Sequence, residues 1–277
     1  MNIYRCSAWR MATLFLFLVA APLAVADVAD GSDYSKIRVS QEGAIAVLKF
    51  DNPPRHTLTQ TAVEELSDFL DRVAADDSVR VLVLTGASDR IFISHYDVGE
   101  IGAKATARQG VERPLHPMHR ALLKIEQLPK PVIAVINGRA HGGGYETALA
   151  ADFRFLSSDG TVGLPEVGIG IIPGGGGTQR LPRLIGYGKA KKLIMLGKTV
   201  DAKTALELGM VTRVAAPADL MTEAMAFANE LAKRSPVALA QIKKVMRDGA
   251  HLPIEEAVKV EQKGYYTATQ SVDWQKR

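Results

Sequence analysis

The chain has 277 residues, with 34 Lys and Arg against 30 Asp and Glu, so its formal net charge is +4. This small surplus is spread along a nearly balanced sequence and forms no basic stripe, which excludes the electrostatic footprint of a nucleic-acid-binding protein. The length suits one large domain with a sizeable core.

Residues 1–26 follow the pattern of a secretory signal peptide. Arg5 and Arg10 precede an apolar run at 11–21, which is too short to span a bilayer comfortably, and Ala24-Val25-Ala26 offers a cleavage site. We therefore predict cleavage of this segment, no stable membrane insertion of the mature chain, and a periplasmic or secreted location. The alternative is a retained anchor, or a downstream start that leaves the protein cytoplasmic.

Short runs of apolar and β-branched residues predict buried strands at residues 44–50, 79–85 and 130–136. Apolar residues recur at helical spacing at Val63, Leu66, Leu70 and Val73. They predict a helix over the sheet, with a capping box from Thr61 to Glu64 at its start. A second amphipathic helix is predicted over 115–127. The polar stretch from Gly102 to Pro114 is predicted to be a loop beside a binding site.

His116 and His119 are separated by two residues, a spacing that can serve a metal ion. We discount a metal site, because Pro117 lies between them and neither a Cys nor a convincing carboxylate completes the ligand set. The glycines after Glu166 contain neither the Gly-Lys-Ser/Thr of a P-loop nor a dinucleotide-binding fingerprint. A nucleotide-hydrolysing or dinucleotide-dependent function is therefore excluded.

The most informative stretch runs from Asn137 to Arg180. The strand at 130–136 leads straight into the glycines Gly142 to Gly144, which let a ligand approach the main chain closely. The apolar residues after Glu146 predict that a helix starts there. Free N–H groups at a helix start stabilise charge that develops on a carbonyl oxygen, so we interpret this turn as an oxyanion hole.

Two carboxylates accompany this turn. Glu146 lies three residues past Gly143, and Glu166 follows twenty residues later in an irregular Gly/Pro-rich stretch that lets the chain fold it back beside the first. Two carboxylates beside an oxyanion hole suit proton transfer next to a thioester carbonyl. Each feature alone is weak, because glycine runs are mostly turns and glutamates are usually solvated. His141, just before the glycines, is interpreted as a packing residue of the turn.

From Gln179 onward the pattern is helical. Gly209 is predicted to end one helix as its C-terminal cap, and Ser235 with Pro236 to open another as N-cap and first-turn proline. The predicted helices span about 179–184, 190–196, 201–208, 220–234, 236–248 and 254–269.

Four motifs together resemble the signature of the enoyl-CoA hydratase/isomerase (crotonase) family: Asn137-Gly138, Gly142-Gly143-Gly144-Tyr145-Glu146, Pro165-Glu166 and the run from Pro173 to Leu181. They stand in the family's order and spacing, and the resemblance extends from about Ile37 to about Asp273. It implies an α/β fold, a spiral of repeated β-β-α units over residues 27–216. A helical C-terminal segment, 217–277, would then serve trimerisation, giving a homotrimer or a dimer of trimers.

The resemblance implies an acyl-CoA lyase that adds water across a trans-2-enoyl thioester, an enoyl-CoA hydratase. The resemblance to the family implies that Glu146 orients and activates water while Glu166 supplies the proton at C2. The N–H groups of Tyr96 and Gly143 would form the oxyanion hole. No metal or redox cofactor is implied, because coenzyme A is part of the substrate. Further substrate contacts are implied at Arg55, His56, His95, Asp97, Gly142, Pro173 and Gly174.

The chain departs from the family at Ser94-His95-Tyr96-Asp97, where relatives usually carry Ala-Gly-Ala-Asp. His95 replaces a glycine and would be strained if its position needs φ > 0. The bulky His95 and Tyr96 side chains are expected to reshape the acyl pocket, whereas a main-chain N–H donor survives a change of side chain. Arg55 and His56 belong to a turn that touches the adenine end of coenzyme A in relatives, although an exposed basic turn is the plainer interpretation.

Two alternatives stay open. A double-bond isomerase also abstracts a proton beside the thioester but generally needs only one of these carboxylates, so the presence of both favours a hydratase. A non-catalytic acyl-thioester or partner-binding protein is suggested by the secretory signal and the altered loop. Coenzyme A is mainly intracellular, so an exported hydratase lacks an obvious substrate.

Overall fold

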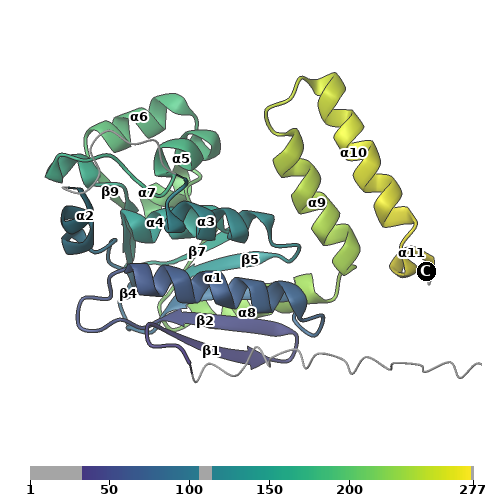
Figure 1. The fold of residues 1–277 in the computed structure, drawn as a ribbon, viewed down its shortest axis with the longest axis horizontal. Helices are drawn as coiled ribbons and strands as arrows, with labels where there is room; N and C mark the ends of the chain where they lie inside the picture. Colours follow the sequence, from purple (N-terminus) through teal and green to yellow (C-terminus); the bar gives the residue numbers. More distant parts are fainter. Residues whose placement is uncertain (1–32, 106–113, 276–277) are drawn as a thin grey trace, which may run out of the picture.

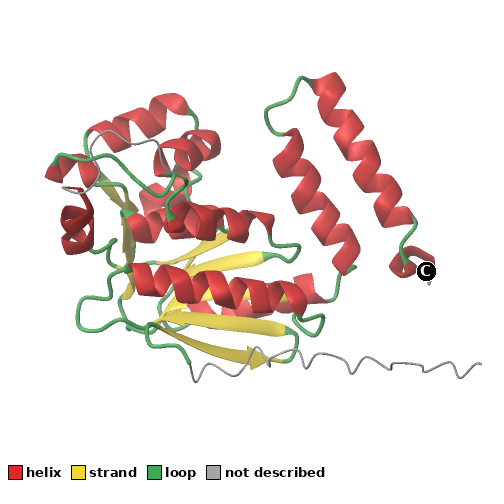
Figure 2. Cartoon of the chain, in the orientation of Figure 1, coloured by secondary structure: helices red, strands yellow, loops and turns green. Residues whose placement is uncertain are grey.

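The computed structural model describes residues 33–105 and 114–275 (Figure 1). The predicted signal peptide and residues 106–113 of the predicted loop lie outside these ranges. Two sheets form the centre of the molecule, with helices packed around them and a pair of helices standing to one side (Figure 2).

The larger sheet has six strands in the order β1-β2-β3-β5-β7-β10. β1 and β2 form an antiparallel hairpin, and all the other neighbours in this sheet are parallel. The three strands predicted from apolar runs are confirmed as β2, β3 and β5. The bounds are β1 Ile37–Glu42, β2 Ile45–Phe50, β3 Val81–Gly86, β5 Val132–Ile136, β7 Phe153–Ser157 and β10 Arg213–Ala215.

The smaller sheet has the order β4-β6-β8-β9 and explains the repeated unit of the fold. Three successive strand pairs, β3–β4, β5–β6 and β7–β8, each place the first strand in the large sheet and the second in the small one. A helical segment follows each pair, which is the predicted β-β-α spiral. The bounds are β4 Ile91–Ile93, β6 Arg139–His141, β8 Thr161–Gly163 and β9 Thr199–Asp201.

The central strands are buried on both faces, which explains their continuous apolar sequences. On one face, α8 (Leu220–Ala232) packs Leu220, Ala224 and Ala228 against the inner side chains of β2, β3 and β5. On the other face lie α1 (Gln60–Ala75) and α3 (Pro117–Gln127) (Figure 1). The sheet is therefore a rigid base for the loops at its carboxyl edge.

Two helix boundaries differ from the predictions. Helix α1 starts earlier than predicted, because Thr59 is its N-cap and accepts a hydrogen bond from Ala62 N at 3.2 Å. The predicted capping box from Thr61 to Glu64 is wrong, although the predicted apolar face is buried. The predicted loop is also wrong at 102–105, which belongs to α2 (Val98–Ala105). That helix forms because Asp97 Oδ1 accepts from Glu100 N at 3.1 Å.

The predicted helices of the second half are confirmed. Ser235 caps α9 by accepting from Ala238 N at 3.2 Å, and Gly209 lies at φ 77° after α7. Helices α9 and α10 pack against each other as a hairpin beside the body of the molecule (Figure 1). None of the helices within the described ranges is both long and apolar enough to cross a membrane. The bounds are α5 Gly177–Ile185, α6 Tyr187–Met195, α7 Ala202–Glu207, α9 Pro236–Gly249, α10 Ile254–Thr269 and α11 Val272–Gln275.

Candidate active site

The centre of the site is the start of α4 (Gly143–Ala150), which follows directly from β6. Gly142 is its N-cap at φ 51°, a conformation that favours glycine, and Glu146 N donates to Gly142 O at 2.9 Å to close the first turn. The predicted helix start after Glu146 is therefore wrong, since Glu146 lies inside the first turn. A Cβ on Gly144 would overlap the backbone of Ile93, so glycine lets α4 press its N-terminus against β4.

The loop that carries Tyr96 is fixed by an isolated parallel bridge to Leu58. Leu58 N donates to His95 O at 2.9 Å, and Asp97 N donates to Leu58 O at 2.8 Å. In extended backbone successive N–H groups point to opposite sides, so the Tyr96 N–H faces away from Leu58. It faces Gly143, whose ideal Cβ position lies 3.2 Å from Tyr96 N.

This geometry brings together the two predicted backbone donors. A helix offers no internal partner to the N–H of its first residue, so the Gly143 N–H is directed out of the helix end. The suspected strain at His95 is absent: among the described non-glycine residues, only His56 has a positive φ, of 51°. His95 and Tyr96 therefore carry their side chains on backbone without left-handed strain.

Glu146 is only 2% exposed and its Oε1 accepts two backbone hydrogen bonds. The donors are Gly175 N at 2.7 Å and Gly177 N at 2.8 Å. Burial raises the pKa of Glu146, while these two N–H groups and the Arg180 charge oppose that rise by favouring the carboxylate.

Glu166 opens a short 3₁₀ helix, η1 (Glu166–Ile169), in the stretch that the sequence suggested was irregular. Its Oε1 lies 3.0 Å from the ideal Cβ position of Gly142, which places its carboxyl group at the start of α4. Burial, together with the negative charge of Glu146, raises the pKa of Glu166 to about 7. Oε2 is buried without a hydrogen-bond partner among the described residues, as expected of a group that meets a ligand.

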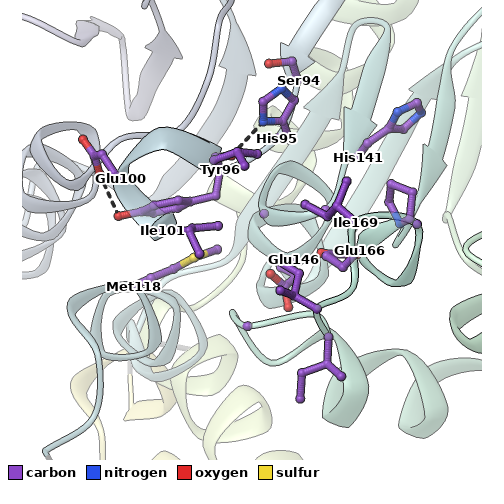
Figure 3. A pocket seen from close by; sticks show the side chains of 18 of the residues that line it. Ser94, His95, Tyr96, Glu100, Ile101, Met118, His141, Glu146, Glu166 and Ile169 are labelled. Carbon is purple, nitrogen blue, oxygen red and sulfur yellow. Dashed lines mark hydrogen bonds between the residues drawn. The ribbon is translucent and has the colours of Figure 1, made fainter. Parts of the chain in front are cut away.

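A single cavity of about 780 Å³ joins these groups. Figure 3 shows the Glu146 and Glu166 side chains on one side of it, with Tyr96 and Met118 across from them. The cavity wall is largely apolar, which suits a hydrocarbon chain. Its apolar side chains include Val98, Ile101, Met118, Ile169, Ile171 and Ile172.

The structure brings some of the other predicted contacts into this cavity and leaves others outside its lining. His95, Gly142 and Gly174 line it, and so does His141, which sequence reasoning treated as a packing residue. His141 Nε2 lies 3.0 Å from Thr161 Oγ1, and burial lowers the pKa of His141 to about 4, so its imidazole is neutral at physiological pH.

Arg55, His56, Asp97 and Pro173 do not line the cavity. The carbonyl oxygens of Arg55 and His56 accept from Ser94 Oγ at 2.7 and 3.1 Å, so their turn supports the Tyr96 loop. Asp97 caps α2, and Pro173 is buried beside the glycine turn. Within the described residues, no group of three His, Cys, Asp or Glu side chains is arranged to hold a metal ion.

Sequence reasoning missed the two N–H groups that contact Glu146 and the side chain behind them, Arg180. The motif from Pro173 to Leu181 marked this turn, but only as part of the resemblance. Its glycines are close to Glu146 because of tertiary packing: a Cβ on Gly175 would lie 2.6 Å from Glu146 Oε2.

A family model described as enoyl-CoA hydratase/isomerase matches residues 40–277. The chain therefore belongs to the enoyl-CoA hydratase/isomerase family, and it is an enzyme with the crotonase fold. In this chain the fold places one buried carboxyl group, Glu146, and one half-buried carboxyl group, Glu166, beside the backbone of Tyr96 and Gly143.

The relatives named as hydratases are similar over most of their length. The short-chain-enoyl-CoA hydratase of Clostridium acetobutylicum is 34% identical over 234 residues, 84% of this chain and 89% of that protein. The crotonyl-CoA hydratase of Syntrophomonas wolfei is 34% identical over 230 residues, 82% and 87% of the two chains. The crystal structure of enoyl-CoA hydratase from Bacillus anthracis is similar with a TM-score of 0.79 and 32% identity, covering 86% of this chain and 93% of that one.

Proposed function

We propose that the protein is an enoyl-CoA hydratase that adds water across the double bond of a trans-2-enoyl thioester. The observation that carries this proposal is the meeting of two carboxyl groups, the buried Glu146 and the half-buried Glu166, with the backbone donors of Tyr96 and Gly143 in one cavity. The names of the hydratase relatives support the same reaction.

In the proposed reaction the thioester oxygen accepts hydrogen bonds from Tyr96 N–H and Gly143 N–H, which stabilise the enolate as negative charge develops. Glu146 orients the water and takes its proton as the oxygen attacks C3. Glu166 gives its proton to C2. The reaction as proposed uses these groups and water, and coenzyme A enters as part of the substrate.

The electrostatics of the two carboxyl groups support this division of roles. Burial raises the pKa of both groups, to about 7 for Glu166; at Glu146 the two N–H donors and the Arg180 charge oppose the rise, whereas at Glu166 the negative charge of Glu146 adds to it. Neighbouring groups that act in opposite directions on the pKa values of two carboxyl groups are typical of an acid and base pair.

The direct test is incubation of the purified protein with crotonyl-CoA while the enoyl absorbance is followed. A hydratase removes this absorbance and forms 3-hydroxybutyryl-CoA. An isomerase would instead convert a 3-enoyl thioester to the 2-enoyl form without hydrating it. Thioester binding by a thermal shift, with no turnover of either substrate, would favour the non-catalytic alternative.

Hydration is expected to decline as the pH rises through about 7. Glu166 must carry a proton to deliver it to C2, and its raised pKa of about 7 means that this proton is present below that pH and lost above it. At pH values above this pKa, in the alkaline limb of the pH–rate profile, kcat/KM should fall about tenfold per pH unit. The two carboxyl groups interact, so the apparent pKa of this decline describes the pair and not one residue alone. A profile of kcat/KM that stays flat from about pH 6 to about pH 9 would contradict the assignment.

Tyr96 is expected to restrict acyl chain length. Its hydroxyl donates to Glu100 Oε2 at 3.1 Å and its ring stands edge-on to His116, with ring centroids 6.2 Å apart. Tyr96→Ala should raise the kcat/KM ratio of a longer enoyl-CoA to crotonyl-CoA by at least about tenfold, because it opens the wall and keeps the backbone donor. His95→Gly should shift the ratio in the same direction.

Tyr96→Phe is the matched control, because it keeps the ring and should keep the wild-type preference. The measurement is kcat/KM for a series of enoyl-CoA lengths. Complete loss of activity with unchanged folding would show that a side chain at position 95 or 96 has a chemical role, which would contradict the assignment of the backbone N–H.

We also propose that the protein forms a homotrimer or a dimer of trimers through residues 217–270. The α9–α10 hairpin stands beside the body, and its large apolar side chains are exposed, among them Ile242, Met246, Ile254 and Tyr265. Exposed apolar side chains gathered on one element are typical of an interaction surface. A monomer by light scattering at micromolar concentration would contradict this proposal.

For location, we propose export to the periplasm or the medium with cleavage after Ala26. The support is the arginine-flanked apolar run and its small-residue cleavage site. N-terminal sequencing of native protein from separated cell fractions should find Asp27 first. Cytosolic material that starts at Met1 would overturn it.

A further inference from the structure

Arg180 on α5 is tied to the turn that contacts Glu146. Its Nε lies 2.7 Å from Glu126 Oε1 of α3, and its Nη1 donates to Gly175 O at 2.7 Å. Only 13% of the side chain is exposed. Gly176 lies at φ 101°, and a Cβ there would overlap Arg180 Nη1, so the guanidinium lies close against this turn.

The same turn faces Glu146 with its N–H groups. Gly175 N and Gly177 N both donate to Glu146 Oε1, while Gly175 O accepts from Arg180. The Gly175–Gly176 peptide, whose carbonyl accepts from the guanidinium, thus lies between the two peptides whose N–H groups contact the carboxylate. Hydrogen bonds to a charged group are strong and depend on orientation. A residue that holds this turn in place therefore also affects how readily the Glu146 carboxyl group is protonated.

We propose that Arg180 is a positioning residue for Glu146: it holds the Gly175 carbonyl so that two N–H groups point at the carboxylate, and it adds a positive charge behind them. This inference rests on the proposed function, in which Glu146 is the ionised partner that activates water. Arg180 acts through the turn and is given no contact with the substrate.

The charges around Glu146 make Arg180 the group to test. Arg180 is the cation that lowers the pKa of Glu146, after the two backbone donors and against the larger effect of burial. Glu126 carries the opposite charge and forms an ion pair with Arg180 at 2.7 Å. The other titratable or charged groups that line the same cavity are Glu166 of η1, His116 at the N-cap of α3, His119 of α3, Glu100 of α2, Arg139 and His141 of β6, and His95 and Tyr96.

Arg180→Met removes the charge and the donors but keeps an apolar stem of similar length. Glu146 is then protonated at higher pH. The fall of hydration kcat/KM at low pH, the acid limb of the profile, should move up by about one pH unit. At pH values below this limb, kcat/KM should be about tenfold lower than in the wild type. kcat should fall more than KM changes. Arg180→Lys keeps the positive charge but lacks the planar N–H donors of the guanidinium, so it should shift the acid limb less.

Glu126→Gln supplies a shift of opposite sign. The amide still accepts from Arg180 Nε but no longer offsets its charge, so the acid limb should move to lower pH. The matched control is Arg183→Met on the same helix. Arg183 is exposed and its guanidinium donates to Gln179 O at 2.7 Å and lies 2.9 Å from His251 Nε2, away from the Glu146 turn. This variant should keep the wild-type profile.

A readout that needs no turnover separates this inference from the proposed function. In protein labelled with ¹³C-carboxyl glutamate, the infrared band missing in Glu146→Gln identifies Glu146, and its titration is followed in each variant. Opposite shifts in Arg180→Met and Glu126→Gln, with wild-type behaviour in Arg183→Met, support the inference even in a protein without hydratase activity.

The inference is overturned by an active wild type in which Arg180→Met folds normally by circular dichroism but keeps the wild-type limb and the wild-type Glu146 titration. Shifts of the same sign in Arg180→Met and Glu126→Gln also overturn it, because they would indicate general damage to packing. Where Arg180→Met does not fold, Arg180→Lys and Glu126→Gln decide in the same way.

Discussion

Glu146→Gln and Glu166→Gln are each expected to lower kcat for hydration by at least ~10²-fold, the typical contribution of one positioned acid or base. The amide keeps the size of the side chain and loses the proton function. At position 146 the amide oxygen can still accept from Gly175 N and Gly177 N, so the fold and thioester binding should be largely retained.

The double variant should be little worse than the more damaged single variant. In the proposed mechanism both carboxyl groups act in one transition state, Glu146 on the water and Glu166 on C2, and the effects of groups that act as a unit are not additive. The measurement is kcat for crotonyl-CoA hydration, with thioester affinity as the check on binding. Glu207→Gln, an exposed change on α7, is the control that should leave both values unchanged.

Full hydration by Glu146→Gln alongside abolished hydration by Glu166→Gln would contradict the two-carboxylate mechanism. An isomerase that uses one carboxylate would then account better for the site. Retained activity in both variants would remove either side chain from the chemistry.

The central strands are the part of the fold that the sequence predicts best. β3 and β5 are covered on both faces, by α8 on one side and by α1 and α3 on the other, so every residue is apolar or small and the run is continuous. This apolar pattern lies within a short segment of sequence, so the strand can be predicted from that segment alone.

Helix starts depend on contacts that the local sequence does not contain. Glycine disfavours a helix interior, so Gly143 and Gly144 argue against a helix that begins before Glu146. Close packing of Gly144 on Ile93 overrides this preference. The start of α4 is therefore decided by β4, which lies about fifty residues earlier in the sequence.

In the site, too, some features can be predicted from local sequence and others depend on tertiary contacts. The two carboxylates are found through motifs, but the donors to Glu146 lie 29 and 31 residues away, and nothing in the local pattern of Gly175 or Gly177 assigns them this contact. His95 would be strained only if its position needed a positive φ, and among the described non-glycine residues the one with a positive φ is instead His56. Backbone conformation follows the tertiary path, which the bridge from Leu58 to Tyr96 sets.

Gly143→Pro is expected to be harsher than either carboxylate variant, because it deletes the N–H that would stabilise the enolate. One such donor is typically worth ~3 kcal/mol, or about 10²- to 10³-fold in kcat. Proline is well tolerated at the first position of a helix, so α4 itself should still form. The ring adds crowding, since even a Cβ at this position would lie 3.0 Å from Tyr96 Cβ and 3.4 Å from Met118 Cε.

Gly143→Ala separates the two effects, because it brings the same Cβ contacts and keeps the N–H. Alanine should also lower kcat/KM, because its Cβ would lie 3.0 Å from Tyr96 Cβ and 3.2 Å from Tyr96 N, and only the Met118 side chain can yield readily. Proline should be at least about 10²-fold worse than alanine, with both variants showing cooperative thermal unfolding. If proline and alanine lower kcat/KM equally, crowding alone explains the loss, and the Gly143 N–H has no part in stabilising the enolate.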